Sequence, residues 1–237
     1  MRLRKKHFAI PEMTENPYVF FNGQENKGKW KEVFGNDNPI YLEIGAGKGT
    51  FTIESAKRNK NINYIMVDIE TNALIYATRK IIDEELTNVR AMPINAENIL
   101  DYFDKDELDR IYINFCNPWP KLRHKKRRLT YPRFLEKYKV ILKPKSQIYF
   151  KTDDLELFEE SLDYFKDEGF STLIEDFDMK LEDYPQNIVT EYESKFRGLG
   201  EKIKFGVFEH YVNQKLKWID NKTPEIYNNF QELKRWI

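Results

Sequence analysis

Cysteine and histidine are scarce in this chain of 237 residues, which contains one cysteine and three histidines. A single cysteine, Cys116, excludes an intramolecular disulfide and a metal site built from several cysteines. The histidines stand apart in the sequence, with no partners at metal-ligand spacing, so we expect no metal site. One lone cysteine is also typical of a reducing compartment, and we expect the protein to be cytoplasmic.

Long apolar runs are absent as well. No stretch approaches the roughly 20 apolar residues that cross a membrane, and the basic N-terminus lacks the apolar segment of a signal peptide. We therefore expect no membrane partner and no cleaved leader. An excess of one charge is also missing, because 39 Lys and Arg balance 39 Asp and Glu.

The charges are nevertheless unevenly distributed. Between Lys121 and Arg133 there are seven Lys or Arg and no acid, whereas acids outnumber bases from Asp153 to Glu193. A local basic block predicts a polyanionic partner better than net charge does. Arg123, Lys125, Lys126, Arg127 and Arg128 are therefore candidates for contacts with a nucleic-acid backbone.

Chain length and a hydrophobic content of 41% suffice for one compact domain. Residues 1–38 show no sustained period, so we expect a flexible basic N-terminal arm, with a short helix around Trp30. Residues 39–212 form the expected domain, and residues 213–237 an expected C-terminal helical extension, since Ile226, Phe230 and Leu233 recur at helical spacing. The sequence does not distinguish a monomer from a homodimer.

Apolar runs alternate with helical patterns throughout the domain, which predicts an α/β fold. The order of strand, crossover helix and strand indicates a mostly parallel, seven-stranded sheet with helices on both faces, as in Rossmann-like folds. The expected strands are Ile40–Ile44, Ile62–Ile69, Val89–Ile94, Arg110–Phe115, Gln147–Phe150, Ser171–Phe177 and Ile203–Tyr211.

A glycine-rich turn follows the first expected strand and reads Gly45-Ala46-Gly47-Lys48-Gly49. It lacks the Lys-Ser/Thr pair of a phosphate-binding P-loop, and Thr50 stands where a dinucleotide fingerprint has glycine. With Glu43 two residues ahead, the turn resembles motif I of class I S-adenosylmethionine-dependent methyltransferases. A purely structural strand-to-helix turn is the alternative.

Two polar residues end the next expected strands. Asp68 is placed to accept both ribose hydroxyl protons of an adenosine cofactor, and Asn95 to accept from the adenine amino group. Each residue is also placed to cap a helix. The carboxyl ends of adjacent parallel strands meet at one edge of a sheet, so these positions and the glycine turn predict one cofactor site.

The stretch from Asn114 to Leu129 reads Asn-Phe-Cys-Asn-Pro-Trp-Pro-Lys-Leu-Arg-His-Lys-Lys-Arg-Arg-Leu. Together with Phe150-Lys151-Thr152-Asp153 and Thr190-Glu191-Tyr192-Glu193, it resembles the bacterial tRNA (guanine-N(7)-)-methyltransferases, over roughly residues 1 to 210. The resemblance implies a Rossmann-like methyltransferase fold, S-adenosylmethionine as cofactor, tRNA as partner, and methylation of a guanine in the variable loop. It also implies roles for two groups of residues. The cofactor positions are Glu43, Gly45, Gly47, Asp68, Asn95 and Asn117, and the substrate positions are Lys121, Asp153, Thr190, Glu191, Tyr192 and Glu193.

Two family positions carry amides here instead of acids. Asn117 occupies the position of the proposed catalytic aspartate, and Asn95 also replaces an acid. N7 of guanine has a free lone pair and no proton, so positioning matters more than proton abstraction, and we predict retained activity with Asn117 as the catalytic residue. Asn117-Pro118-Trp119 also resembles the motif of enzymes that methylate exocyclic amines. A catalytically weakened tRNA-binding homologue is the third hypothesis. The acidic segment after Asp154 is predicted to face solvent, away from RNA.

Overall fold

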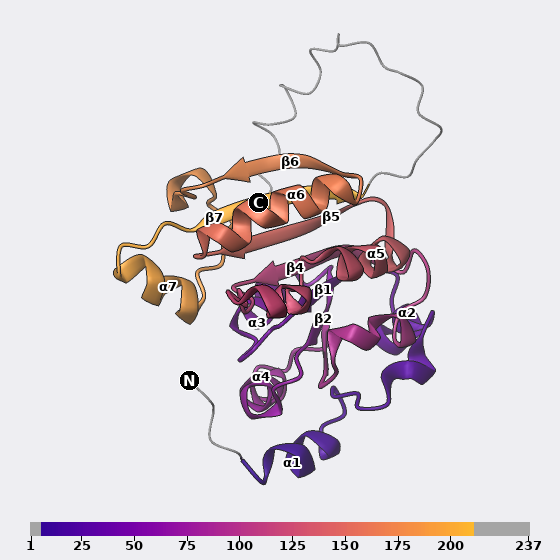
Figure 1. Cartoon of the computed structure of the whole chain (residues 1–237). Coiled ribbons are helices and arrows are strands. Elements are labelled where there is room, and N and C mark those ends of the chain that lie inside the picture. The colour runs from indigo at the N-terminus through magenta and orange to yellow at the C-terminus, as the bar shows by residue number, and fades with distance from the viewer. Residues whose placement is uncertain (1–5, 211–237) are drawn as a thin grey trace.

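The computed structural model describes residues 6–210, and Figure 1 shows the chain as a twisted sheet with helices packed against it. The strands of the described chain are β1 Ile40–Ile44, β2 Asn63–Val67, β3 Val89–Met92, β4 Leu108–Asn114, β5 Leu142–Thr152, β6 Phe170–Asp176 and β7 Lys204–His210. The α-helices are α1 Ala9–Glu15, α2 Trp30–Phe34, α3 Thr50–Arg58, α4 Thr71–Asp83, α5 Pro132–Ile141, α6 Leu155–Asp167 and α7 Glu191–Gly198. The 3-10 helices are η1 Gly23–Asn26, η2 Ala96–Asp101, η3 Leu122–Arg127 and η4 Leu181–Asp183.

The sheet has seven strands within the described chain, in the order β3-β2-β1-β4-β5-β7-β6. All neighbours pair in parallel except β7, which runs antiparallel to both β5 and β6. The predicted α/β fold class is therefore confirmed. Chain order reverses between β1 and β4, and in open sheets of this kind ligands bind beside the carboxyl ends of the strands at that point.

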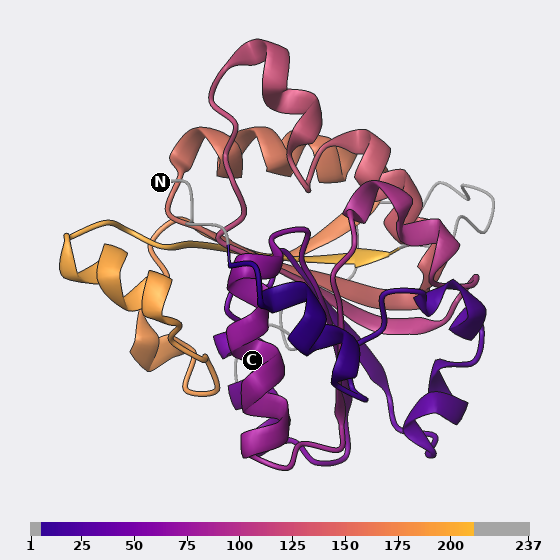
Figure 2. The ribbon, with the colours of Figure 1, turned by 90° about the horizontal axis from the view of Figure 1, so that it is seen from below.

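Helices cover the two faces of the sheet differently. Figure 2 shows α6 on one side and α1 and α4 on the other. Strand residues alternate between the faces: Leu42, Ile111 and Phe150 are fully buried in the main core with residues of α5 and α6. Their neighbours Tyr41, Arg110 and Tyr149 face the side of α3. One face is thus a dry apolar core, and the other carries polar and aromatic side chains.

The prediction of a flexible arm over residues 1–38 is wrong for residues 6–38, although the expected short helix around Trp30 is present as α2. Helix α1 packs on α4 with Ala9 and Met13 buried, and Trp30 is fully buried, with its indole Nε1 donating to the Tyr102 carbonyl at 2.9 Å. Phe20 N also donates to the Ala91 carbonyl at 2.9 Å, beside β3. These residues lie in short elements that share no hydrophobic period, so the sequence pattern does not predict their packing. The predicted C-terminal helix lies outside the described residues.

Candidate active site

The glycine turn links β1 to α3, and its three glycines have φ of 78°, 56° and 70°, in the left-handed region. A Cβ on Gly49 would lie 2.4 Å from Ala77 Cβ, so Gly49 permits α3 to pack against α4. A Cβ on Gly47 would meet nothing within 4 Å, and Gly47 N donates to Asp68 Oδ2 at 2.7 Å. Gly49 therefore serves packing, whereas Gly47 lies beside open space next to a carboxylate.

Glu43 is a buried carboxylate at the base of this turn. It is 4% exposed and accepts hydrogen bonds from Thr52 Oγ1 at 2.6 Å and from Asn114 Nδ2 at 3.0 Å. Burial raises the pKa of Glu43 to about 7, against the opposing effect of the two hydrogen bonds and of Lys151. A cation beside such a carboxyl group stabilises its ionised form.

A pocket of about 380 Å³ lies between the turn and the start of α7; we call it the loop pocket. Glu43, Gly45 and Gly47 form one side, and Thr190, Glu191 and Tyr192 face them. Lys48 Nζ lies 3.0 Å from Glu191 Oε2, so an ion pair joins the two sides. The structure therefore brings together predicted cofactor and predicted substrate residues that are about 140 positions apart.

Asp68 and Asn95 lie at the ends of β2 and β3, and their hydrogen bonds bear on the two interpretations of each. The Asp68 carboxylate accepts from the backbone N–H of Gly47 and, at 2.7 Å, from that of Glu70, and burial raises its pKa. Asn95 Oδ1 caps η2 by accepting from Glu97 N at 3.0 Å. Capping is thus observed for Asn95, and contact with adenine stays a prediction for it. Asp68 holds the glycine turn in place.

The turn after β4 holds Asn117 between two strained residues. Phe115 and Trp119 have φ of 52° and 45°, which is uncommon for aromatic residues and tends to occur at functional sites. Asn117 is exposed, and its Oδ1 accepts from Trp119 N at 3.0 Å. This bond fixes the turn and leaves the Asn117 Nδ2 group with no acceptor among the described residues. The catalytic role of Asn117 stays a prediction.

The other predicted substrate residues to be placed are Tyr192, Asp153 and Lys121. Tyr192 packs on Phe115 with ring centroids 5.0 Å apart. Burial raises its pKa to about 12, together with the charge and the hydrogen bond of Asp153. Asp153 and the tyrosine hydroxyl are therefore in contact. Lys121 is exposed immediately before η3.

Glu193 lies in a buried charge network, and the prediction that it contacts substrate is wrong for this structure. Its side chain is fully buried and accepts from Lys151 Nζ at 3.0 Å, from Arg197 Nη2 at 2.8 Å and from Asn187 Nδ2 at 3.0 Å. Burial lowers the pKa of Lys151 while the charge of Glu193 opposes that effect. Glu193 thus anchors α7 to β5.

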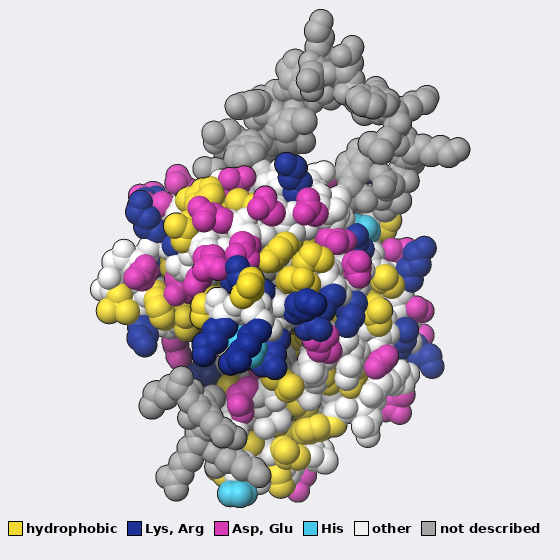
Figure 3. Space-filling view, in the orientation of Figure 1, with side chains coloured by type: hydrophobic (Ala, Val, Ile, Leu, Met, Phe, Trp, Pro, Cys, Tyr) yellow, Lys and Arg dark blue, Asp and Glu magenta, His cyan; other side chains and the backbone are white. Residues whose placement is uncertain are grey.

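The segment Lys121–Arg128, here called the basic loop, divides into exposed and buried cations. Lys121, Arg123, Lys126 and Arg127 are exposed, and Figure 3 shows Lys and Arg gathered at the middle of one face. Arg127 also lies over the Trp119 ring, 5.1 Å from its centroid. These four side chains form the surface that fits a phosphate backbone.

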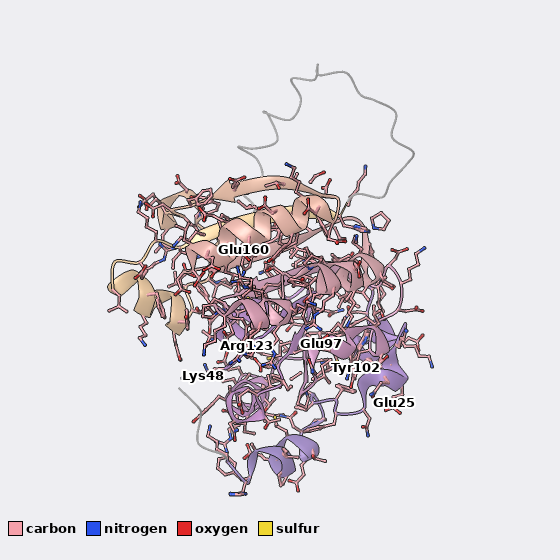
Figure 4. The ribbon with its side chains drawn as sticks, viewed as in Figure 1. Glu25, Lys48, Glu97, Tyr102, Arg123 and Glu160 are labelled. Atoms are coloured by element: carbon pink, nitrogen blue, oxygen red, sulfur yellow. The ribbon has the colours of Figure 1, made fainter. Side chains whose placement is uncertain are left out.

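Arg128 and Lys125 are corrected from RNA contacts to structural ion pairs. Arg128 is 1% exposed; its Nε donates to the Pro118 carbonyl at 2.6 Å, and its Nη1 pairs with Glu160. Lys125 pairs with Glu160 and, at 2.9 Å, with Glu156. These ion pairs show that the predicted acid-rich helix α6 lies against the basic loop and not away from it; Figure 4 labels Glu160 on α6 and Arg123 in the basic loop.

Several site residues were missed in the sequence. Asn114 is buried and donates a hydrogen bond to Glu43. Asn114, Lys48, Phe51 and Phe115 all line the loop pocket. Apolar and polar residues alternate in Ile111-Tyr112-Ile113-Asn114, so Tyr112 and Asn114 point to the same face of the sheet as Glu43. This alternation is the feature of the sequence that indicates Asn114. The described residues hold no group of three metal-ligating side chains and no helix long and apolar enough to cross a membrane.

The residues around the loop pocket fit a cationic methyl donor with an adenosine part. A buried carboxylate at the pocket base, and a glycine beside open space, give room and charge for a sulfonium and an ammonium group. Asp68 would face a ribose at the end of β2. No basic side chain other than Lys48 and Lys195 lines the pocket within the described chain, and Lys48 is paired with Glu191.

Two solved structures that share this fold are described as methyltransferases. The 16S rRNA methyltransferase KamB matches with a TM-score of 0.62 and 12% identity, covering 78% of this chain and 94% of that chain. An antibiotic-related methyltransferase matches with a TM-score of 0.59 and 21% identity, over the same shares of the two chains. These similarities establish a Rossmann-like methyltransferase fold.

Sequence comparison gives the family. Residues 37–205 match the family described as "Putative methyltransferase". The tRNA (guanine-N(7)-)-methyltransferase of Clostridium tetani is 52% identical over 86% of this chain and 97% of that protein. The enzyme of the same name from Clostridium acetobutylicum is 54% identical over 88% of this chain and 99% of that protein. The chain belongs to the tRNA (guanine-N(7)-)-methyltransferase family.

Proposed function

We propose that the protein transfers a methyl group from S-adenosylmethionine to N7 of a guanine in tRNA, in the variable loop, in the cytoplasm. The observation that carries the proposal is the loop pocket, where the motif I turn and Glu43 face Thr190, Glu191 and Tyr192. The exposed cations of the basic loop follow the turn that ends β4, beside this pocket. Relatives of the same name about half identical to this chain support the substrate.

The chemistry asks for little proton transfer. S-adenosylmethionine supplies a methyl group made electrophilic by its sulfonium. The lone pair of guanine N7 forms the new C–N bond as the C–S bond breaks, and the electrons of that bond remain on sulfur. N7 carries no proton, so no general base acts before transfer. The protein contributes orientation of the base and charge at the site.

We propose a role for each residue of the site. Glu43 places negative charge near the cationic end of the donor, while Asp68 and Asn95 face its ribose and adenine. Asn117 orients the target base with its free amide donor, and Tyr192, with Asp153 against its hydroxyl, packs beside it. The remaining residues proposed to hold guanosine are Lys121, Thr190 and Glu191.

The test is methylation of unmodified tRNA by the purified protein with labelled S-adenosylmethionine, followed by nucleoside mass spectrometry. We expect 7-methylguanosine. A tRNA whose variable-loop guanine is replaced by adenine is the control and should take up no label. A base methylated on an exocyclic amine would instead support the alternative interpretation of Asn117-Pro118-Trp119.

Variants at position 117 separate a positioning role from none. We expect Asn117→Ala to lower kcat, because the free amide donor is lost, with little change in KM for tRNA. Asn117→Asp restores the residue usual in the family, and a faster aspartate variant would identify a weakened site. If Asn117→Ala kept the full rate, the assigned role would be wrong. Absence of heat on titration with S-adenosylmethionine would favour the non-catalytic tRNA-binding homologue.

A further inference from the structure

A second, larger cavity lies on the same face of the sheet. It has a volume of about 770 Å³ and is bounded by the strands β1, β2, β4 and β5, by α3, and by the segment before α7. We call it the tyrosine cavity, because Tyr41, Tyr64, Tyr112 and Tyr149 line it. Phe51 and Asn114 line both this cavity and the loop pocket, so the two adjoin.

Strand register explains why these side chains meet. Tyr41 pairs with Tyr64 on one side and Arg110 on the other, and Tyr112 pairs with Tyr149. Residues paired across strands point to the same face. A wall of aromatic rings with one arginine in its centre therefore forms from four strands.

Arg110 is partly buried, and its guanidinium group has an unusual environment. Its guanidinium carbon lies 4.7 Å from the centroid of Tyr41 and 4.3 Å from that of Tyr149, and Nη1 donates to the Tyr112 hydroxyl at 3.1 Å. Its Nε is buried and has no acceptor among the described residues. Arg110 thus has aromatic faces and one neutral hydroxyl where an anion would satisfy it.

Arg90, a buried arginine in the same sheet, shows how a guanidinium is satisfied when its role is structural. Arg90 also lies near aromatic rings, but its Nη1 donates to the carbonyls of Thr87 and Val89, both at 2.8 Å, and its Nη2 to that of Val33 at 3.0 Å. Those carbonyls satisfy a purely structural guanidinium. Arg110 has none of them, and a buried donor without an acceptor is unfavourable.

The charge of Arg110 is not cancelled within the cavity. No Asp or Glu is among its lining residues within the described chain, whereas Arg58, Arg110 and Lys151 are. Lys151 is neutralised by Glu193 at 3.0 Å. Burial raises the pKa of Tyr64, Tyr112 and Tyr149, so their hydroxyls stay neutral and cannot balance the arginine.

We propose that the tyrosine cavity is a second binding site, for a nucleoside monophosphate whose phosphate lies on Arg110 and whose base stacks on the tyrosine rings. An arginine fork binds phosphate oxygens through two parallel hydrogen bonds. Stacking on aromatic side chains tolerates any base. The volume lies within the range of about 300–1,000 Å³ that is usual for small-molecule sites.

The nucleotide has two possible sources with the same chemistry. It is either free in solution or a residue of the bound tRNA next to the target guanine, because the cavity adjoins the loop pocket. Competition separates them: if tRNA displaces uridine 5′-monophosphate, the RNA supplies the nucleotide. If both bind together, the ligand is a free nucleotide.

The test titrates the full-length protein with uridine 5′-monophosphate by calorimetry. Uridine is used because it is neither the target base nor the base of the cofactor, so the result does not depend on methyl transfer. We expect binding of uridine 5′-monophosphate, and at least about tenfold weaker binding of uridine and of inorganic phosphate, since uridine lacks the charge-assisted hydrogen bonds of the phosphate and inorganic phosphate lacks the stacking of the base.

Arg110→Met should weaken this binding at least about tenfold. Lys57→Met is the control, because Lys57 lies on α3 next to Arg58, pairs with Glu54 and Glu84, and lies outside the cavity lining. Arg110→Lys keeps the charge without the fork and should bind with intermediate affinity; it also serves if the methionine variant does not fold. Equal binding of uridine 5′-monophosphate by the parent and a folded Arg110 variant, or none by the parent, would overturn the proposal.

Discussion

The carboxylate of Glu43 accepts a hydrogen bond of 3.0 Å from the side-chain amide of Asn114. This bond joins the ends of β1 and β4, the two strands between which chain order reverses. It also holds a carboxylate at the base of the loop pocket, where burial sets its pKa at about 7. Protonation of one buried group is thereby coupled to the site at which a cation is proposed to bind.

Affinity for S-adenosylmethionine should therefore depend on pH. Only ionised Glu43 attracts the cationic donor, so we expect the dissociation constant to fall as pH rises toward 7, by up to roughly tenfold per pH unit, and to level off above. Folding stability of the free protein has the opposite sign. A raised pKa favours the folded state at pH below about 4.5, the ordinary pKa of a glutamate, and this contribution is lost as pH rises through about 7. Calorimetric titrations at pH values from roughly 5.5 to 8.5 measure the dissociation constant of S-adenosylmethionine. The profile of Glu43→Gln should be flat, and a flat profile in the parent would contradict the role of Glu43.

The ion pair of Lys48 and Glu191 should affect ligand exchange more than folding. Both side chains are exposed, at 53% and 64%, although they join the two sides of the loop pocket. Exposed pairs contribute about 0–1 kcal/mol, so Lys48→Met should shift Tm by no more than about 4 °C. We expect faster dissociation of S-adenosylmethionine, measured by stopped-flow. Lys57→Met, which breaks exposed pairs on α3, is the matched control. Unchanged dissociation would show that the pair does not restrict the pocket.

Breaking the buried pair of Lys151 and Glu193 should destabilise the protein strongly. Glu193→Ala leaves the Lys151 ammonium buried without its partner, and loss of one partner of such a pair costs about 3–5 kcal/mol. Urea denaturation measures the loss. The double variant with Lys151→Met as well should recover part of it, because no lone charge remains. Equal stability of the single and double variants would mean that the buried charge is not the cause.

The basic loop should respond to mutation in two different ways. Arg123→Ala and Lys126→Ala remove exposed cations, so each should weaken tRNA binding and reduce the slope of log affinity against log salt by about 1. Arg128→Ala removes a buried cation and leaves Glu160 without this partner, so it should lower stability by about 3 kcal/mol or more. Filter binding at several salt concentrations and thermal melting distinguish the two. A salt slope that Arg123→Ala and Lys126→Ala leave unchanged would remove the loop from the RNA surface.

The amino-acid sequence predicted the strands and the glycine turn because these depend on local pattern. Strands such as Ile40–Ile44 alternate with helical segments, and parallel strands bring their carboxyl ends to one edge, which placed the glycine turn near Asp68 and Asn95. The arm was different. Trp30, Met13 and Ala9 lie in short elements without a common period, so their burial depended on contacts with distant parts of the chain.

By itself, the sequence determined the fold class, the motif I turn and the family, because these follow from local patterns and motifs. Only the tertiary structure decided which charges are free. Arg123 and Arg128 are five residues apart in one basic run, yet α6 brings Glu160 to Arg128 and leaves Arg123 exposed. The tertiary structure also decided that Arg110 lies among tyrosines from four strands. Desolvation and pairing depend on neighbours that only the packed sheet brings together.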